Sequence, residues 1–209
     1  MLVFADAHLL VFDKPAGLLC VPGRGGDKQD CLSARAQAEF PDALVVHRLD
    51  MATSGLCVMA RGAVTQRQLS VMFAAREVAK RYEAVVAGKL EAAGGQWNTI
   101  DLPIAPDWPN RPLRVIDAVD GKPSITLWRW VACDEAAHTT RVELEPVTGR
   151  THQLRVHLQA TGHAILGDAL YAPAQVQALS ARLLLHAAQL RFAHPATGET
   201  MTFTSPPPF

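Results

Sequence analysis

This chain of 209 residues has no long hydrophobic run, no excess of charge of one sign and no closely spaced pair of cysteines. Its first fifteen residues contain short apolar stretches that are broken by Asp6, His8, Asp13 and Lys14. A membrane-spanning helix needs roughly 20 apolar residues, and a secretory signal needs an uninterrupted apolar region. We therefore expect a cytoplasmic protein that does not bind a membrane.

The charges balance, because 20 basic and 20 acidic side chains give a formal net charge of zero. Proteins that hold nucleic acid by bulk electrostatics usually carry a basic excess, so the composition does not indicate such a protein. The basic residues are nevertheless 15 arginines and 5 lysines. Since arginine forks onto phosphates and stacks on bases, this bias is compatible with RNA without indicating it.

Metal-ligating and redox patterns are also missing. The chain has four cysteines, Cys20, Cys31, Cys57 and Cys133. They form no C-x-x-C pair, so we expect isolated buried thiols and neither a zinc knuckle nor a redox dithiol. His152 and His157 lie five residues apart, which differs from the i, i+4 spacing of a helical zinc pair. No metal site is predicted.

Short apolar runs bounded by proline and glycine predict a fold rich in strands. Strands are expected at 9–12, 18–21, 44–46, 56–59, 82–86, 125–131, 140–145, 183–192 and 201–203. Helices are expected at 31–40, with Asp30 as the N-cap, at 63–76 and at 151–160. Residues 102–122 hold four prolines and are expected to form an irregular loop. The pattern indicates a single α+β domain over residues 1–209, in which helices pack against a mixed, mostly antiparallel sheet.

Two clusters of polar residues are candidates for a site. His47-Arg48-Leu49-Asp50 follows a predicted strand and precedes a tight turn, where an aspartate could act in chemistry or simply cap the amides of the turn. The run 146–157 crowds polar donors at a strand-to-helix junction, where free N–H groups favour an anion. A surface ion pair of Arg155 is the structural alternative for that cluster.

Taken in order, these clusters and several shorter motifs resemble the RluA family of pseudouridine synthases. The matching segments are 13–18, 47–50, 53–55, 80–82, 121–126, 148–157, 162–163, 166–168 and 185–187. They run through almost the whole chain, and together they are far more specific than any one tetrapeptide. Because Lys14-Pro15 comes so early, no N-terminal S4-like domain is expected.

The resemblance implies a fold, an activity and partners. The fold would be the pseudouridine synthase catalytic core, a mixed, mostly antiparallel sheet in two halves with a central cleft and flanking helices. The activity would be that of an isomerase that converts uridine to pseudouridine in structured RNA loops, without a metal or an organic cofactor. The expected substrates are the anticodon stem-loop of tRNA and a hairpin loop of 23S rRNA, and the expected oligomeric state is a monomer.

The resemblance also assigns roles to residues. Asp50 would be the nucleophile, with either uracil C6 or ribose C1′ as the attacked atom. Arg155 would pair with Asp50 and keep it charged, and Tyr82 would stack on the target base. Arg48 would enter the space that the flipped nucleotide leaves, and Leu185 would form the apolar wall under the uracil.

Two arginines of the proline-rich loop, Arg111 and Arg114, are expected to contact RNA. A noncatalytic RNA-binding or RNA-chaperone module on the same fold is the alternative, and the intact set of Asp50, Tyr82 and Arg155 favours the enzyme. A nicotinamide enzyme would need a helix after the glycines at 23–26, and a zinc deaminase would need H-x-E and C-x-x-C. The sequence contains neither pattern.

Overall fold

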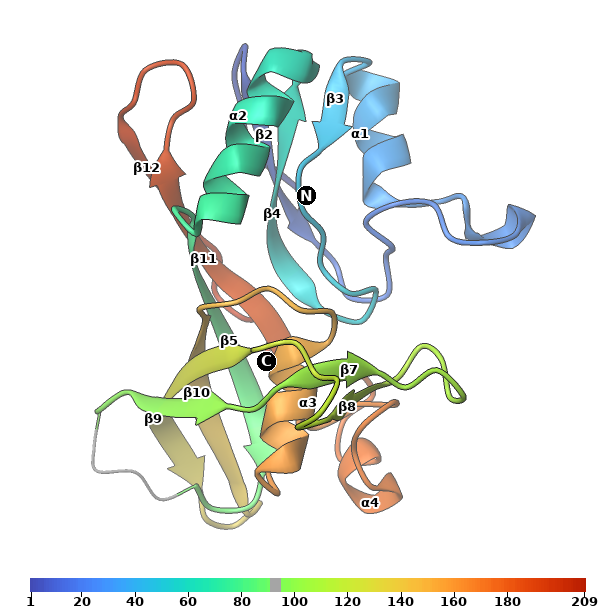
Figure 1. Cartoon of the computed structure of the whole chain (residues 1–209), viewed down its shortest axis with the longest axis vertical. Helices are drawn as coiled ribbons and strands as arrows, with labels where there is room; N and C mark the ends of the chain where they lie inside the picture. Colours follow the sequence, from blue (N-terminus) through green and yellow to red (C-terminus); the bar gives the residue numbers. More distant parts are fainter. Residues whose placement is uncertain (91–94) are drawn as a thin grey trace. The chain divides into compact units, whose positions relative to one another are not determined.

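The computed structural model describes residues 1–90 and 95–209, and the chain forms two compact units (Figure 1). Unit 1 consists of residues 1–80 and 186–208, and unit 2 consists of residues 81–185 with Phe209. Both units are built from strands that pair mostly antiparallel, with helices packed against them. The predicted α+β class is confirmed. The single-domain boundary at 1–209 and the central cleft stay predictions.

Unit 1 has the strand order β1-β2-β4-β11, with β3 paired to β4 and β12 paired to β11. Its strands are β1 (Leu2–Ala5), β2 (Leu9–Lys14), β3 (Ala43–Val45), β4 (Ser54–Arg61), β11 (Leu185–Ala193) and β12 (Thr200–Thr204). Its helices are the short 3₁₀ turn Gly26–Lys28, α1 (Leu32–Glu39) and α2 (Gly62–Ala75). Strand β4 pairs antiparallel with β2 and parallel with β11.

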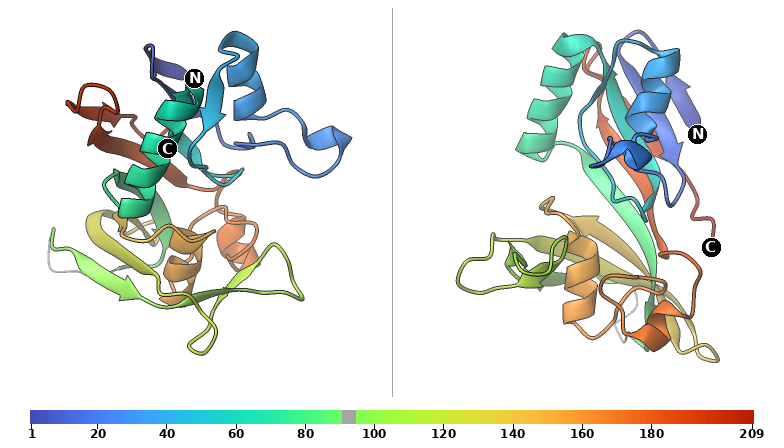
Figure 2. Two further views of the ribbon diagram at one scale, coloured as in Figure 1. Left: turned by 45° about the horizontal axis from the view of Figure 1, so that its top comes forward. Right: turned by 90° about the vertical axis from the view of Figure 1, so that its right-hand side faces the viewer.

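Strand β4 lies inside the sheet of unit 1, with β2 on one side and β11 on the other. Nearly all its residues are therefore buried, on both faces. The apolar run 56–60 therefore lacks the alternation of a half-exposed strand. Helix α2 covers one face, as Figures 1 and 2 show, and its Leu69, Met72 and Phe73 pack on the core as their helical spacing predicted.

Unit 2 has the strand order β5-β10-β9-β6, in which every neighbour is antiparallel, and a separate hairpin of β7 and β8. Its strands are β5 (Ala79–Ala87), β6 (Asn98–Asp101), β7 (Ile104–Pro106), β8 (Arg114–Ile116), β9 (Ile125–Asp134) and β10 (Thr139–Pro146). Its helices are α3 (Gln153–Ala160) and the short α4 (Ala174–Gln177). Helix α3 packs against β8, β9 and β10 (Figure 1).

Three local predictions are wrong. Residues 104–106 and 114–116 form a two-stranded hairpin inside the segment expected to be irregular. The prolines permit it, because Pro106 is the last residue of β7 and the other three lie outside both strands. Residues 18–21 form only an isolated bridge, Leu19 to Cys31. Asp30 does not cap α1. The Cys31 side chain does so by accepting from the Ala34 amide.

Candidate active site

Asp50 lies in the turn that joins β3 to β4 in unit 1 and is half-buried. Its carbonyl oxygen accepts a hydrogen bond of 3.1 Å from the Thr53 amide, which closes the turn. The two residues after the turn, Thr53 and Ser54, are buried. Arg48, two residues before Asp50, is exposed. The turn therefore presents both predicted side chains beside a rigid strand.

The turn rests on Lys14, which is 0% exposed. Lys14 Nζ donates hydrogen bonds to three carbonyl oxygens, those of Pro15, Leu18 and Met51, at 3.0, 2.8 and 3.2 Å. Met51 directly follows Asp50, and its carbonyl also accepts from the Gly17 amide at 2.8 Å. A buried ammonium needs such acceptors to offset its loss of hydration. Lys14 thus ties the loop after β2 to the Asp50 turn.

His47 holds the other end of the same turn. Its Nε2 accepts a hydrogen bond of 3.0 Å from the Val58 amide, and its ring stacks on Phe73 of α2 at 4.5 Å. An acceptor nitrogen carries no proton, so this contact requires neutral imidazole. Burial, together with the positive charge of Lys80, lowers the pKa of His47 to about 3. The hydrogen bond from Val58 and the lowered pKa both favour neutral imidazole at His47.

Two cysteines that the sequence indicated as isolated lie together beneath the turn. Cys20 Sγ accepts from the Leu49 amide at 3.2 Å. A hydrogen bond from the Cys57 thiol lowers the pKa of Cys20 to about 7, and the same bond together with burial raises the pKa of Cys57. Both thiols are buried and are not linked to each other by a disulfide. The predicted free, buried thiols are confirmed for Cys20 and Cys57, although the two side chains are neighbours in the structure.

A directed chain of hydrogen bonds also fixes the start of β4. Ser54 Oγ lies 2.8 Å from His186 Nδ1, and His186 Nε2 lies 3.2 Å from the Ser205 carbonyl oxygen. Since a carbonyl only accepts, Nε2 carries the proton and Nδ1 accepts from Ser54. Ser205 Oγ donates to Asp13 at 2.8 Å. Next to these hydrogen bonds, a Cβ on Gly55 would lie 2.4 Å from the Ala187 carbonyl oxygen, so only glycine fits at this position.

Tyr82 belongs to β5 in unit 2 and is half-buried. It pairs with Leu144 of β10, which is buried. Because side chains alternate along a strand, Tyr82 shares its face with the buried Ala84 and Val86, while Glu83 points to the opposite face. Leu185, at the start of β11, is also buried.

Arg155 lies on α3 and is 4% exposed. Its guanidinium forks onto Asp168, which is 1% exposed, with Nε to Oδ2 at 2.8 Å and Nη2 to Oδ1 at 2.6 Å. Its cationic centre also lies 5.1 Å from the centre of the Tyr171 ring. This arrangement contradicts the alternative of a surface ion pair. A contact with Asp50 would join the two units and stays a prediction.

Gln153 and His157 lock the junction that precedes α3. Gln153 uses its whole amide group: its oxygen accepts from Thr148 and from the Arg150 amide, and its nitrogen donates to the Ile125 carbonyl and to Thr126. His157 is fully buried between Thr126 and the Leu102 carbonyl oxygen, at 2.9 Å from each. Burial lowers the pKa of His157. These contacts fix the position of Arg155 on the first turn of α3.

The hairpin β7–β8 carries Arg111 and Arg114, and its tip projects from unit 2 (Figure 1). At the tip, the Arg111 guanidinium lies 3.8 Å from the centre of the Trp108 ring, and Trp108 is 65% exposed. The Arg114 amide donates to the Tyr171 hydroxyl at 3.0 Å. The hairpin thus presents a stacked indole and guanidinium pair to solvent.

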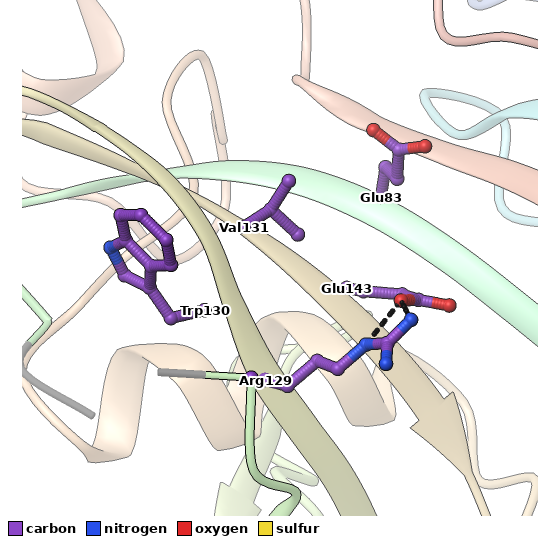
Figure 3. Close-up of a pocket in the computed structure, with 6 residues that line it drawn as sticks. Glu83, Arg129, Trp130, Val131 and Glu143 are labelled. Atoms are coloured by element: carbon purple, nitrogen blue, oxygen red, sulfur yellow. Dashed lines mark hydrogen bonds and ion pairs between the residues drawn. The ribbon is translucent and has the colours of Figure 1, made fainter. Parts of the chain in front are cut away.

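A pocket of about 320 Å³ in unit 2 contains none of the predicted residues. It is lined by Glu83, Gly95, Arg129, Trp130, Val131 and Glu143 (Figure 3). Figure 3 shows Arg129 reaching to Glu143, an ion pair that Arg81 extends at 3.0 Å. This pocket lies on the charged face of β5, β10 and β9, opposite Tyr82, so we do not assign it to the active site.

The predicted site residues divide between the two units. Unit 1 contains Arg48 and Asp50, and unit 2 contains Tyr82, Arg155, Leu185, Arg111 and Arg114. Among residues 1–90 and 95–209, no three histidine, cysteine, aspartate or glutamate side chains are grouped to hold a metal ion. In the same residues, no helix combines the length and apolarity that crossing a membrane requires.

The sequence did not identify the side chains that hold these residues in place. They are Lys14, His47, Gln153, His157, Asp168, Tyr171 and His186. All except Tyr171 lie inside the motifs that carry the family resemblance. Their presence in the motifs was visible, but their roles depend on contacts between distant segments.

Comparison with known proteins agrees with this geometry. Residues 8–160 match the family model described as RNA pseudouridylate synthase. The chain is 46% identical over 209 residues to the dual-specificity RNA pseudouridine synthase RluA of Escherichia coli (strain K12), covering 100% of this chain and 94% of that protein. It is 48% identical over 197 residues to the protein of the same name from Vibrio parahaemolyticus, covering 93% and 78%. The solved structure of human RNA Pseudouridylate Synthase Domain Containing 1 has a TM-score of 0.82 and 29% identity, covering 100% of this chain and 83% of that one.

Proposed function

Since this chain belongs to the RNA pseudouridylate synthase family and is an isomerase that converts uridine in RNA to pseudouridine, we propose that Asp50 is its nucleophile. The observation that supports this role is the anchoring of the Asp50 turn. Lys14 donates a hydrogen bond to the carbonyl oxygen of Met51, the residue after Asp50, and His47 accepts one from the amide of Val58 in β4. The turn is held from both ends, while Asp50 as a residue is half-buried. A preorganised nucleophile needs this kind of support.

The chemistry suits a carboxylate. Pseudouridine carries its ribose on uracil C5, so the reaction breaks the N1–C1′ bond and forms a C5–C1′ bond. C5 loses its hydrogen to solvent as a proton, and N1 takes up a proton in exchange. An aspartate is ionised at neutral pH and attacks carbon without a general base, unlike serine. We propose that no metal or organic cofactor takes part.

The remaining roles follow the geometry of the two units. Tyr82 projects from the buried face of β5 and would stack on the flipped uracil, with Leu185 beneath it. Exposed Arg48 would replace the flipped nucleotide in the RNA. Arg155, rigidly forked on Asp168, would face the nucleophile. Arg111 and Arg114 would contact the RNA backbone or bases from the projecting hairpin.

We propose that the substrates are a tRNA anticodon stem-loop and a hairpin loop of 23S rRNA. The similarity to proteins named dual-specificity supports this choice. So does the zero net charge, because a protein without a broad basic surface is suited to a compact loop whose bases can be splayed. The enzyme would act as a cytoplasmic monomer.

The test compares the wild-type chain with Asp50→Asn on transcripts that carry tritium at uridine C5. Wild type should release tritium in the presence of excess chelator, and Asp50→Asn should release none while its RNA affinity stays within about a few-fold. Release by Asp50→Asn would disprove the nucleophile. Binding without release by the wild type would indicate a noncatalytic RNA-binding module. Mapping pseudouridine in tRNA and 23S rRNA from a deletion strain and its complemented parent tests the two substrates.

A further inference from the structure

Tyr171 connects two parts of unit 2 that the proposed function uses separately. Its hydroxyl accepts a hydrogen bond of 3.0 Å from the amide of Arg114, the first residue of β8, at the loop end of the hairpin β7–β8. The same hydroxyl lies 2.6 Å from His152 Nδ1, at the N-cap of α3. Its ring lies beneath the Arg155 guanidinium, 5.1 Å from its cationic centre. One side chain therefore contacts the hairpin, the start of α3 and Arg155.

The Tyr171 hydroxyl has two neighbours in this cluster. The hydroxyl oxygen accepts from the Arg114 amide and lies at hydrogen-bond distance, 2.6 Å, from His152 Nδ1. His152 has a left-handed backbone, with φ of 59°, which costs free energy unless its surroundings hold it. The hydrogen bond to Tyr171 supplies such a hold.

Asp168 fixes Tyr171 and Arg155 at the same time. Its Oδ1 accepts from the amides of Leu170 and Tyr171, at 2.9 and 3.2 Å, and both its oxygens bind Arg155. A buried carboxylate with this many donors has one stable position. Residues 168–171 therefore hold the Arg155 guanidinium in one position.

We propose that Tyr171 and Asp168 are positioning residues with separable effects. The Tyr171 hydroxyl orients the RNA-binding hairpin, and the Tyr171 ring with Asp168 orients Arg155 for the chemical step. This inference rests on the proposed function, because it assumes that the hairpin binds RNA and that Arg155 faces the nucleophile. It adds a physical connection between RNA binding and the chemistry.

The test measures kcat and KM for tritium release from a tRNA anticodon stem-loop transcript. Tyr171→Phe removes only the hydroxyl and should raise KM roughly threefold to tenfold with kcat within about twofold, since it loses hydrogen bonds and keeps the ring. Asp168→Asn keeps the shape but removes the carboxylate charge that fixes the Arg155 guanidinium, and should lower kcat about tenfold or more. Tyr171→Leu should show both effects.

Thr140→Val is the matched control. The Thr140 hydroxyl also accepts from a loop amide, that of Leu90, at 3.0 Å, and donates to the Gly88 carbonyl oxygen, but it contacts no predicted site residue. Its kcat and KM should stay within about twofold of wild type. If Asp168→Asn does not fold, the comparison of Tyr171→Phe with Tyr171→Leu decides the question.

Two outcomes would overturn the inference. An unchanged KM in Tyr171→Phe would mean that the hydroxyl does not orient the hairpin, and equal loss of kcat in Tyr171→Phe and Tyr171→Leu would mean that the ring has no separate role. These outcomes are distinct from a failure of the proposed function, which would show as no tritium release by the wild-type protein on any transcript.

Discussion

Lys14 Nζ donates a hydrogen bond of 3.2 Å to the main-chain carbonyl oxygen of Met51, the residue that directly follows Asp50. The lysine is fully buried, and its other two acceptors belong to the loop after β2. A charged side chain therefore lies inside unit 1 and holds the proposed nucleophile's turn through its backbone.

The first prediction concerns this contact. Lys14→Met retains much of the side-chain volume but leaves three carbonyl oxygens without their shared donor, so we expect the free energy of unfolding to fall by roughly 2–4 kcal/mol. Chemical denaturation measures it. Lys28→Met, at an exposed position, is the control and should change stability by no more than about 0.5 kcal/mol. Equal stability of Lys14→Met and wild type would show that the three hydrogen bonds are not needed.

The sequence predicted the elements whose pattern is local. The face of α2 formed by Leu69, Met72 and Phe73 follows from helical spacing alone, and it packs as expected. The hairpin β7–β8 was missed because prolines at 103, 106, 109 and 112 outweigh two short strands in any local window, while the pairing of Ala105 with Val115 is visible only in three dimensions.

At the site too, local motifs were predicted from the sequence and contacts between distant segments were not. Arg155 was identified from its motif, but its fork onto Asp168 joins residues 13 apart through a loop whose course no periodicity describes. Buried histidines were harder still. His47 and His157 look like polar or catalytic residues in the sequence, and the amide and carbonyl groups that bind their rings are brought to them only by tertiary packing. Tyr171 lies outside every recognised motif, so no sequence signal marked it.

The second prediction concerns acid stability. His47 has its pKa lowered to about 3 by burial, so the unfolded chain binds a proton on this side chain between about pH 3 and pH 6.5 while the folded chain does not. Stability is therefore full above pH 6.5 and is lost as pH falls toward 3, by up to about 1.4 kcal/mol per pH unit for each such histidine. His157, whose pKa burial also lowers, acts in the same direction.

Substitution of His47 isolates its contribution to the pH dependence of the unfolding free energy. His47→Gln retains an acceptor for the Val58 amide but does not titrate, so its unfolding free energy should fall less steeply than that of wild type between pH 7 and pH 5. His138→Asn, at an exposed position, should keep the wild-type slope. Denaturant titrations at pH 7, 6 and 5 measure these slopes. Parallel slopes for wild type and His47→Gln would contradict the assignment of a neutral buried His47.

The third prediction concerns Arg155→Lys. Lysine keeps the charge but offers a point donor in place of the planar fork that binds both oxygens of Asp168. We expect kcat to fall about tenfold or more, with KM changed less than kcat, because the cation loses its fixed orientation. Single-turnover tritium release measures the chemical step. A rate near that of wild type would show that charge alone suffices at this position.

The fourth prediction concerns Arg48, the exposed arginine two residues before Asp50. Arg48→Ala should slow the reaction on a structured stem-loop, because no side chain then fills the space of the flipped nucleotide. On a transcript in which the target uridine is already unpaired and unstacked, much of the lost rate should return. Equal loss on both RNAs would remove Arg48 from base flipping. Arg67→Ala on α2 tests whether any arginine of unit 1 has this effect.

The last prediction concerns Trp108 at the tip of the hairpin β7–β8. Its ring is largely exposed and is stacked by the Arg111 guanidinium at 3.8 Å, an arrangement that offers a flat surface for an unpaired base. Stacking of a base on an aromatic ring contributes roughly 1–3 kcal/mol, so Trp108→Ala should weaken stem-loop binding about fivefold or more. Trp108→Phe retains an aromatic face and should recover part of that affinity.

Fluorescence anisotropy with labelled tRNA anticodon and 23S hairpin stem-loops measures both variants, in an Asp50→Asn background that prevents turnover. Leu179→Ala, which removes another exposed apolar side chain of unit 2, is the control and should bind as the parent does. If Trp108→Ala binds both RNAs as tightly as the parent, the hairpin tip does not stack on RNA. If it loses affinity for one RNA only, the tip discriminates between the two proposed substrates, because a ring that stacks on any base would weaken both.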